Sequence, residues 1–169
     1  MNAVLPVERF LFTLDIVARE KQHLCYSWKR LYSQTIDTRW VERLEEHPEL
    51  AEQLEAFVSR FGRMQDTIAD KLLPRWLMAL AERPGSQIET LNRAERLGVI
   101  DSVEGWLEAR KLRNRLVHEY VESAEVFAED LQLAKEYSAL LVNCFDALCK
   151  YAHNRMNIER ILLPNDAEL

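Results

Sequence analysis

Glycine and proline are scarce in this chain, whose 169 residues include four glycines and five prolines. Neither Asn-Gly nor Asp-Gly occurs, so the strongest short-range signal of a β-hairpin is absent. The stretches between these few breakers are rich in leucine, alanine, glutamate and arginine, which favour helix. With 48% hydrophobic residues, the chain is also long enough to bury one sizeable core. An all-α fold in a single domain is therefore expected.

Positive charge is not in excess, since the formal net charge is -6. This excludes a protein that coats nucleic acid or an anionic membrane through a summed positive field, so any polyanion must be bound by a local patch. The sequence contains no run of ~18 apolar residues, and its N-terminus lacks a basic segment followed by an apolar run. We therefore expect neither membrane insertion nor export, and a cytoplasmic location.

Cysteine is limited to Cys25, Cys144 and Cys149, an odd number without Cys-x-x-Cys spacing. Each lies in an apolar segment with helical periodicity, as expected of reduced thiols that pack as small hydrophobic side chains. The sequence thus predicts neither a disulfide nor a metal site, and it gives no indication of a cofactor.

Apolar residues that recur at three- and four-residue steps predict the helices of the N-terminal half. A long amphipathic helix is expected over about 6–34, with Pro6 near its first turn. A second apolar stripe runs over 50–72. Pro74 follows it and should kink or break the helix that carries it, because proline lacks the N–H and its ring clashes with the preceding turn.

A short helix in the middle of the chain has both of its ends marked. Ser86 and Glu89 have the spacing of a capping box, and Gly98 stands where a glycine just past a helix end belongs. The following helix is expected to begin at Asp101 or Ser102.

That helix should end near Val121, and Ser123 should cap a long final helix. About five helices with short connections favour an up-and-down bundle. We expect residues 1–155 to form this single helical domain and residues 156–169 to form a C-terminal tail. The apolar side chains of the tail should pack on the bundle or on a second chain.

A cluster of cations precedes the end of the helix expected to run to Val121. Arg110, Lys111, Arg113 and Arg115 lie within six residues of an otherwise acidic chain. They are candidates for binding an anion such as an RNA phosphate. The alternative is that Arg115 pairs with Glu119 one turn later and that the others are simply solvated.

The segment RNRLVHEY, residues 113–120, adds an asparagine, a histidine and a tyrosine to this cluster. At 100° per residue, Asn114 and His118 are about 40° apart, and Arg113 and Tyr120 about 20° apart. Arg113 and His118, however, diverge by about 140°, so one straight helix cannot easily direct both at one atom. Two copies of the helix facing each other across a two-fold axis can do so, as can a loss of helical geometry near Val121.

Arg113 and Asn114, followed by three residues and His118, resemble the signature of the HEPN superfamily (higher eukaryotes and prokaryotes nucleotide-binding). The extension to Tyr120 is similar to the more restricted Arg-x4-His-x-Tyr pattern of HepT-type toxins. The upstream segment RFGRMQDTIADKLLP is similar to the second helix of HepT and nucleotidyltransferase-partner proteins, so the resemblance covers about residues 5–155. It implies a HEPN-like helical bundle.

The resemblance also implies an activity, because HEPN ribonucleases cut RNA without a metal or other cofactor. His118 would be the base for the 2′-hydroxyl, and Arg113 would hold the phosphate oxygens with its bidentate fork. Asn114 would orient the phosphate or the imidazole, and His118 of a second subunit would protonate the leaving 5′-oxygen. The products would carry 2′,3′-cyclic phosphate and 5′-hydroxyl ends, and a homodimer would supply the composite site.

By the same resemblance, Tyr120 is the residue to which a cognate nucleotidyltransferase antitoxin attaches AMP. RNA is then the substrate and the antitoxin the protein partner, in a complex that allows a larger hetero-oligomer. Without the resemblance, Tyr120 reads as a half-buried tyrosine at a helix end. Two other readings stay open: a non-catalytic nucleotide- or partner-binding subunit of a small nucleotidyltransferase, and a helical scaffold whose motif stabilises a dimer.

Overall fold

The computed structural model describes residues 3–118 and 123–165, and all regular structure within these ranges is helical. The all-α prediction is therefore confirmed. In chain order the elements are α1 (Pro6–Tyr32), α2 (Thr38–Glu42), α3 (Pro48–Thr67), the π-helical turn η1 (Ile68–Leu72), α4 (Leu73–Ala79), α5 (Gln87–Arg96), α6 (Val103–His118), α7 (Ala124–Met156) and the 3₁₀ turn η2 (Arg160–Leu162).

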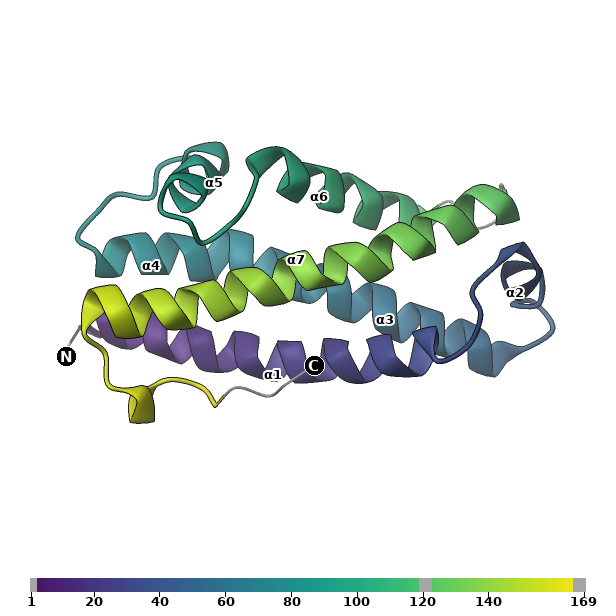
Figure 1. The fold of residues 1–169 in the computed structure, drawn as a ribbon, viewed down its shortest axis with the longest axis horizontal. Helices are drawn as coiled ribbons and strands as arrows, with labels where there is room; N and C mark the ends of the chain where they lie inside the picture. Colours follow the sequence, from purple (N-terminus) through teal and green to yellow (C-terminus); the bar gives the residue numbers. More distant parts are fainter. Residues whose placement is uncertain (1–2, 119–122, 166–169) are drawn as a thin grey trace.

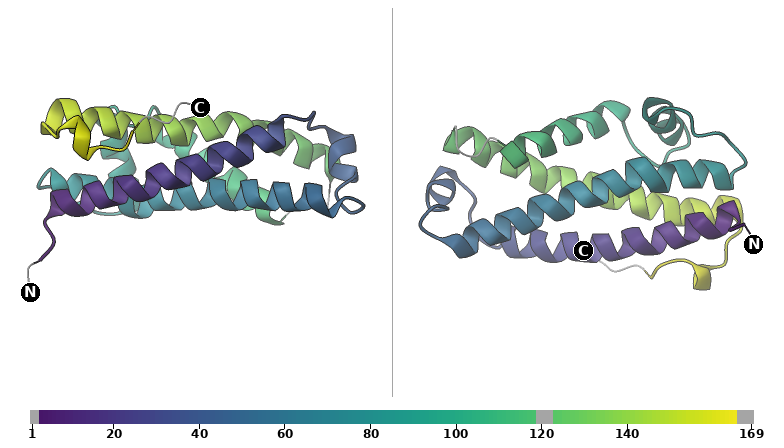
Figure 2. Two further views of the ribbon diagram at one scale, coloured as in Figure 1. Left: turned by 90° about the horizontal axis from the view of Figure 1, so that it is seen from below. Right: turned by 180° about the vertical axis from the view of Figure 1, so that it is seen from behind.

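The long elements form an up-and-down bundle, as Figures 1 and 2 show. The chain runs along α1, returns through α3, η1 and α4, runs forward again along α6, and returns along α7. α1 packs against α3, α4 and α7, whereas α6 lies on α3 and α7. The short α5 packs between the ends of α4 and α6, and α2 contacts α7 at the opposite end of the bundle.

Local capping signals account for the predicted helix ends. The Ser86 hydroxyl accepts a hydrogen bond from the Glu89 amide, while the Glu89 carboxylate accepts one from the Ser86 amide, which completes the capping box of α5. Gly98 has a φ of 79°, the left-handed conformation expected just past a helix. At the start of α7, the Ser123 hydroxyl accepts from the Val126 amide.

Pro74 interrupts the α-helical hydrogen bonding without ending the rod. In an α-helix its ring would clash with the carbonyl of Asp70, and it has no N–H to donate. The chain instead widens into η1, where the Leu73 amide donates to the Ile68 carbonyl five residues earlier. Because a π-helical turn accommodates one extra residue, α4 continues in the direction of α3.

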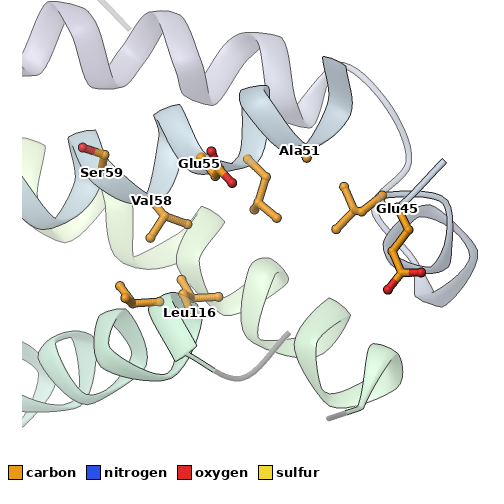
Figure 3. A pocket seen from close by; sticks show the side chains of 9 residues that line it. Glu45, Ala51, Glu55, Val58, Ser59 and Leu116 are labelled. Atoms are coloured by element: carbon orange, nitrogen blue, oxygen red, sulfur yellow. The ribbon is translucent and has the colours of Figure 1, made fainter. Parts of the chain in front are cut away.

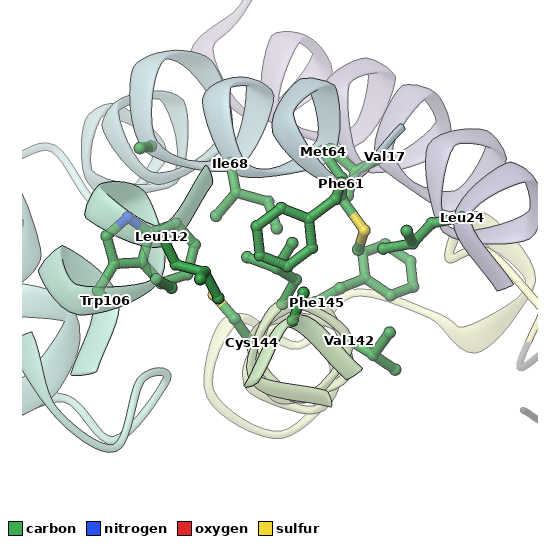
Figure 4. Close-up of a cluster of buried hydrophobic side chains, with 14 of the residues drawn as sticks. Val17, Leu24, Phe61, Met64, Ile68, Trp106, Leu112, Val142, Cys144 and Phe145 are labelled. Atoms are coloured by element: carbon green, nitrogen blue, oxygen red, sulfur yellow. The ribbon is translucent and has the colours of Figure 1, made fainter. Parts of the chain in front are cut away.

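The four long rods share one hydrophobic core (Figure 4). Each contributes side chains that are fully or almost fully buried, because each helix has one apolar stripe that must be removed from water. The labelled members of this cluster are Val17 and Leu24 of α1, Phe61, Met64 and Ile68 of α3 and η1, Trp106 and Leu112 of α6, and Val142, Cys144 and Phe145 of α7.

Two features differ from, or refine, the sequence expectations. The segment after α1 contains the short α2, which the sequence analysis did not predict and which Asp37 caps by accepting from the Trp40 amide. After α7 the tail folds back, so that Ile158 is buried on the bundle while Ile161 is exposed. Cys25, Cys144 and Cys149 form no disulfide within the part of the chain that the structure describes. No helix within the described ranges is long and apolar enough to cross a membrane.

Candidate functional site

Arg113 faces α3 and is held there by Asp66. Arg113 Nη2 donates to Asp66 Oδ2 at 3.1 Å, and Arg113 Nη1 approaches Asp66 Oδ1 at 3.5 Å. The arginine side chain is 29% exposed and the aspartate side chain 46%, so the pair lies at the surface of the α3–α6 contact. A guanidinium has five N–H donors in a fixed plane. The pair with Asp66 therefore orients Arg113 while leaving N–H groups for a ligand.

A glycine makes room for this arrangement. Gly62 lies one turn before Asp66 on α3, directly beneath the Arg113 side chain. A Cβ at residue 62 would lie 2.7 Å from Arg113 Nε, closer than two such atoms can approach. The guanidinium thus lies against bare backbone.

Arg113 lines an open groove of about 400 Å³ between α3, η1 and α6. Two further cations, Arg63 and Lys71, line the same groove together with the carboxylates of Asp66 and Asp70. Arg63, Lys71 and Asp70 are exposed, so their charges are accessible from solvent. The groove thus carries three cations and two carboxylates, a local excess of positive charge that can attract an anion to an otherwise acidic chain.

The other cations of the predicted cluster do not join Arg113. Arg110 hydrogen-bonds to the side-chain oxygen of Gln87 on α5, whose amide nitrogen donates to Asp70 at 2.7 Å. Lys111 pairs with Glu108 on its own helix at 3.1 Å, and its side chain is 68% exposed. Arg110 is therefore tied to the far end of the groove, while Lys111 is a solvated helix charge.

Arg115 points to α7, where it holds Asp130 through two hydrogen bonds. Arg115 Nη2 donates to Asp130 Oδ1 at 2.9 Å, and Arg115 Nε donates to Asp130 Oδ2 at 3.1 Å. The Asp130 side chain is only 9% exposed. The alternative pairing of Arg115 with Glu119 involves a residue outside the described ranges, whereas Asp130 lies on a different helix, fifteen residues away. Arg113 and Arg115 therefore anchor opposite sides of α6.

The remaining motif residues are Asn114, His118 and Tyr120. Asn114 is exposed, one position after Arg113. His118 is the last residue of α6, and only its backbone is described. Tyr120 lies outside the described residues. The structure therefore brings Arg113 together with the groove, whereas the side chains of His118 and Tyr120 stay sequence predictions.

A second hollow, of about 320 Å³, adjoins the groove at the end of the bundle that carries α2. Figure 3 shows its apolar side chains, with the Val58 side chain of α3 directed toward Leu116 of α6. Val58, Ser59 and Val117 line both the hollow and the groove. The two spaces are therefore continuous along α3 and α6.

Glu20 of α1 contacts Thr67, one of the residues that line the groove. Its Oε1 accepts a hydrogen bond from the Thr67 hydroxyl at 2.8 Å, and its Oε2 is buried without a partner among the described residues. Burial raises the pKa of Glu20, and this effect outweighs the Thr67 hydrogen bond and the charges of Arg63 and Lys71, which lower it.

Four residues of the site are not among the predicted site residues, although they lie in the segment that resembles HepT: Gly62, Arg63, Asp66 and Lys71. A signal was available. Gly62, Asp66 and Asp70 are spaced four residues apart, which puts them on one face of a helix. What the sequence could not supply was the partner helix, because Asp66 and Arg113 are 47 residues apart.

Comparison with protein-family models, curated proteins and solved structures finds no match to this chain.

Proposed function

We propose that this protein is a metal-independent HEPN-type endoribonuclease, the toxin of a toxin–antitoxin pair. The observation that carries the proposal is the orientation of Arg113. Its guanidinium is partly buried, fixed by Asp66, and set in a groove with two more cations, Arg63 and Lys71. The resemblance of the segment 113–120 to the HepT pattern supplies the reaction.

In the proposed reaction the Arg113 groove binds the phosphate that is to be cut. Cleavage requires a base for the 2′-hydroxyl, charge stabilisation at phosphorus and an acid for the leaving 5′-oxygen. Arg113 supplies the charge stabilisation, because a guanidinium forms two parallel hydrogen bonds to phosphate oxygens. His118 supplies the base, and the partner subunit's His118 the acid. Asn114, exposed beside Arg113, orients the phosphate or the imidazole.

In this proposal the cations other than Arg113 have two roles, which follow from the contacts that each one makes. Arg110 and Lys71 lie around the groove and extend its positive charge along the RNA backbone. Lys111 is exposed and adds to the same field at longer range. Arg115 is committed to Asp130, so its contribution is to hold α6 on α7.

Labelled RNA incubated with purified protein in EDTA tests the activity. Wild-type protein should yield 2′,3′-cyclic phosphate ends, and Arg113→Ala and His118→Ala should each abolish them while leaving the thermal midpoint nearly unchanged. Arg96→Ala, which removes an exposed arginine of α5, is the matched control and should cleave normally. Arg113→Lys keeps the charge and removes the fork, so it should also be nearly inactive. Wild-type protein that leaves RNA intact would favour the non-catalytic nucleotide- or partner-binding subunit.

The regulatory part of the proposal concerns Tyr120. A cognate nucleotidyltransferase would transfer AMP from ATP to the tyrosine hydroxyl, with release of pyrophosphate. The added phosphodiester would bring negative charge close to Arg113, because the two residues share a helix face if α6 continues to that point. Mass spectrometry after co-expression with the nucleotidyltransferase should show a gain of AMP, and Tyr120→Phe should prevent it. An inactive complex with unmodified Tyr120 would mean that the antitoxin inhibits by binding alone.

A further inference from the structure

We propose that the apolar hollow beside the groove is a subsite for a base of the bound RNA, and that it selects guanine. The inference rests on the proposed function, because it takes the phosphate in the Arg113 groove as its starting point. The hollow lies between α3, α6 and the loop after α2 (Figure 3).

Continuity with the groove is the first argument. Val58, Ser59 and Val117 belong to both spaces, so a phosphate beside Arg113 and a base in the hollow would be separated by little more than these side chains. In a nucleotide a single ribose separates the phosphate from the base. A volume of about 320 Å³ lies at the lower end of the ~300–1,000 Å³ typical of small-molecule pockets.

The apolar side chains that line the hollow favour contact with the flat face of an aromatic ring. Leu54, Val58 and Leu116 are buried or nearly so, and Val117 leaves 48% of its surface exposed on the side of the hollow. Single-stranded RNA is recognised through unstacked bases that are placed against side chains and read on their hydrogen-bonding edges. The hollow supplies the contact surface for one such base.

The polar groups of the hollow determine which base fits. Its charged side chains are two carboxylates, Glu45 of the loop after α2 and Glu55 of α3, and both are labelled in Figure 3. Both are exposed, and neither forms a hydrogen bond or ion pair with another residue in the described ranges. A carboxylate only accepts hydrogen bonds, so the complementary base edge must donate.

Guanine is the base that meets this requirement best. Its N1–H and N2–H₂ groups are adjacent and can donate to both oxygens of one carboxylate. Adenine and cytosine each offer one amino group next to an acceptor nitrogen, and uracil offers one N–H between two carbonyl oxygens. The groove has three cations against two carboxylates, whereas the charged side chains of the hollow are carboxylates, so the charges match a nucleotide with phosphate at one end and a donor edge at the other.

Binding can be measured without cleavage by using trinucleotides whose 2′-hydroxyls are methylated, since the attacking group is then blocked. Fluorescently labelled U-X-U trinucleotides, with X as each of the four bases, should be titrated against the full chain and followed by anisotropy. We expect the guanine form to bind about tenfold more tightly than the uracil form, the size of one good bidentate contact. Glu45→Gln combined with Glu55→Gln should remove the preference. Glu52→Gln, a neutralised glutamate on the side of α3 that faces α1, should keep it.

Ala51→Trp provides an independent test, because this partly buried residue of α3 lines the hollow and a tryptophan there would fill it. It should abolish the guanine preference, whereas Arg113→Ala should weaken all four trinucleotides to the same extent. Equal binding of the four trinucleotides by wild-type protein would overturn the subsite. So would a preference that survives the double glutamine variant. RNA cleavage in EDTA separates the two failures: cleavage without base preference removes the subsite alone, and guanine-selective binding without cleavage removes the ribonuclease alone.

Discussion

The backbone of Gly62 lies so close to Arg113 that a Cβ on residue 62 would be 2.7 Å from Arg113 Nε. This relationship couples α3 to the C-terminal half of α6. Asp66, one turn further along α3, then fixes the direction of the guanidinium. The position of the proposed phosphate-binding group therefore depends on two residues of another helix, neither of which needs to touch RNA.

Gly62→Ala should reduce RNA cleavage without unfolding the protein. Alanine stabilises a helix interior by roughly 0.5–1 kcal/mol relative to glycine, which offsets the cost of moving the Arg113 side chain aside. A displaced guanidinium should lower kcat by about tenfold to a hundredfold, as misplaced positioning groups do. Gly105→Ala in α6 is the control, because a Cβ there meets Leu140 at an ordinary 3.6 Å. Thermal melting and single-turnover cleavage would be measured together, and full activity in Gly62→Ala would show that the Arg113 position is not critical.

Asp66→Asn tests whether Asp66 acts by orienting the Arg113 guanidinium or by its negative charge. The ion pair is partly exposed, so its loss should cost less than ~1 kcal/mol of stability. A more positive groove should leave KM for RNA unchanged or lower it, while the less constrained guanidinium should lower kcat about tenfold. Asp70→Asn removes the same charge from the same groove, but Asp70 accepts from Gln87 and not from Arg113. An equal fall in kcat in both variants would mean that Asp66 acts through its charge alone.

Sequence reasoning succeeded where the signal is local. Pro6, the Ser86–Glu89 box, Gly98 and Ser123 fix helix ends within a few residues, and the structure has them as predicted. The missed α2 also had a local signal, since Asp37 caps it. For the groove, the four-residue spacing of Gly62, Asp66 and Asp70 marks one helix face, but no local signal gives the helix that packs on it. The Arg115–Asp130 contact arises from the packing of α6 on α7, which no pattern within one helix specifies. The Arg113–Asp66 contact arises in the same way.

Arg115→Ala should destabilise the protein more than Arg113→Ala does. Arg115 pairs with a carboxylate whose side chain is 9% exposed, whereas the partner of Arg113 is 46% exposed. Removing the guanidinium from the nearly buried Asp130 should cost about 1–3 kcal/mol, compared with less than ~1 kcal/mol for Arg113. Urea unfolding of the two variants gives the comparison. Unchanged stability of Arg115→Ala with lost cleavage would assign Arg115 to RNA binding.

Glu20→Gln should stabilise the protein at neutral pH. The pKa of Glu20 is raised by burial above its ordinary value of 4.5, so the folded state holds the proton more tightly than the unfolded state. The resulting stability is fully present below the ordinary value and is lost as the pH rises through the folded-state pKa. A glutamine cannot ionise and keeps an oxygen for the Thr67 hydroxyl. Its advantage over wild type in urea unfolding should therefore be largest near neutral pH and disappear in acid. The exposed control Glu52→Gln should show no such gain.

A site that combines residues of two protomers makes a prediction that differs from that of a site formed within one protomer. Arg113 and His118 diverge by about 140° on a straight helix, so one RNA phosphate is best reached by Arg113 of one protomer and His118 of its partner. Inactive Arg113→Ala and His118→Ala proteins, unfolded together and refolded as a mixture, would then form heterodimers in which one of the two sites keeps Arg113 and the partner's His118 and lacks only the second His118. With random pairing about half of the dimers are mixed, so measurable activity should return, up to about a quarter of the wild-type value and less to the extent that the second His118 is needed as the acid. If Arg113 and His118 act within the same subunit, every site in the mixture lacks one group and no activity returns. Sedimentation of the mixture would establish that dimers formed, and a monomer that cleaves RNA would contradict the shared site directly.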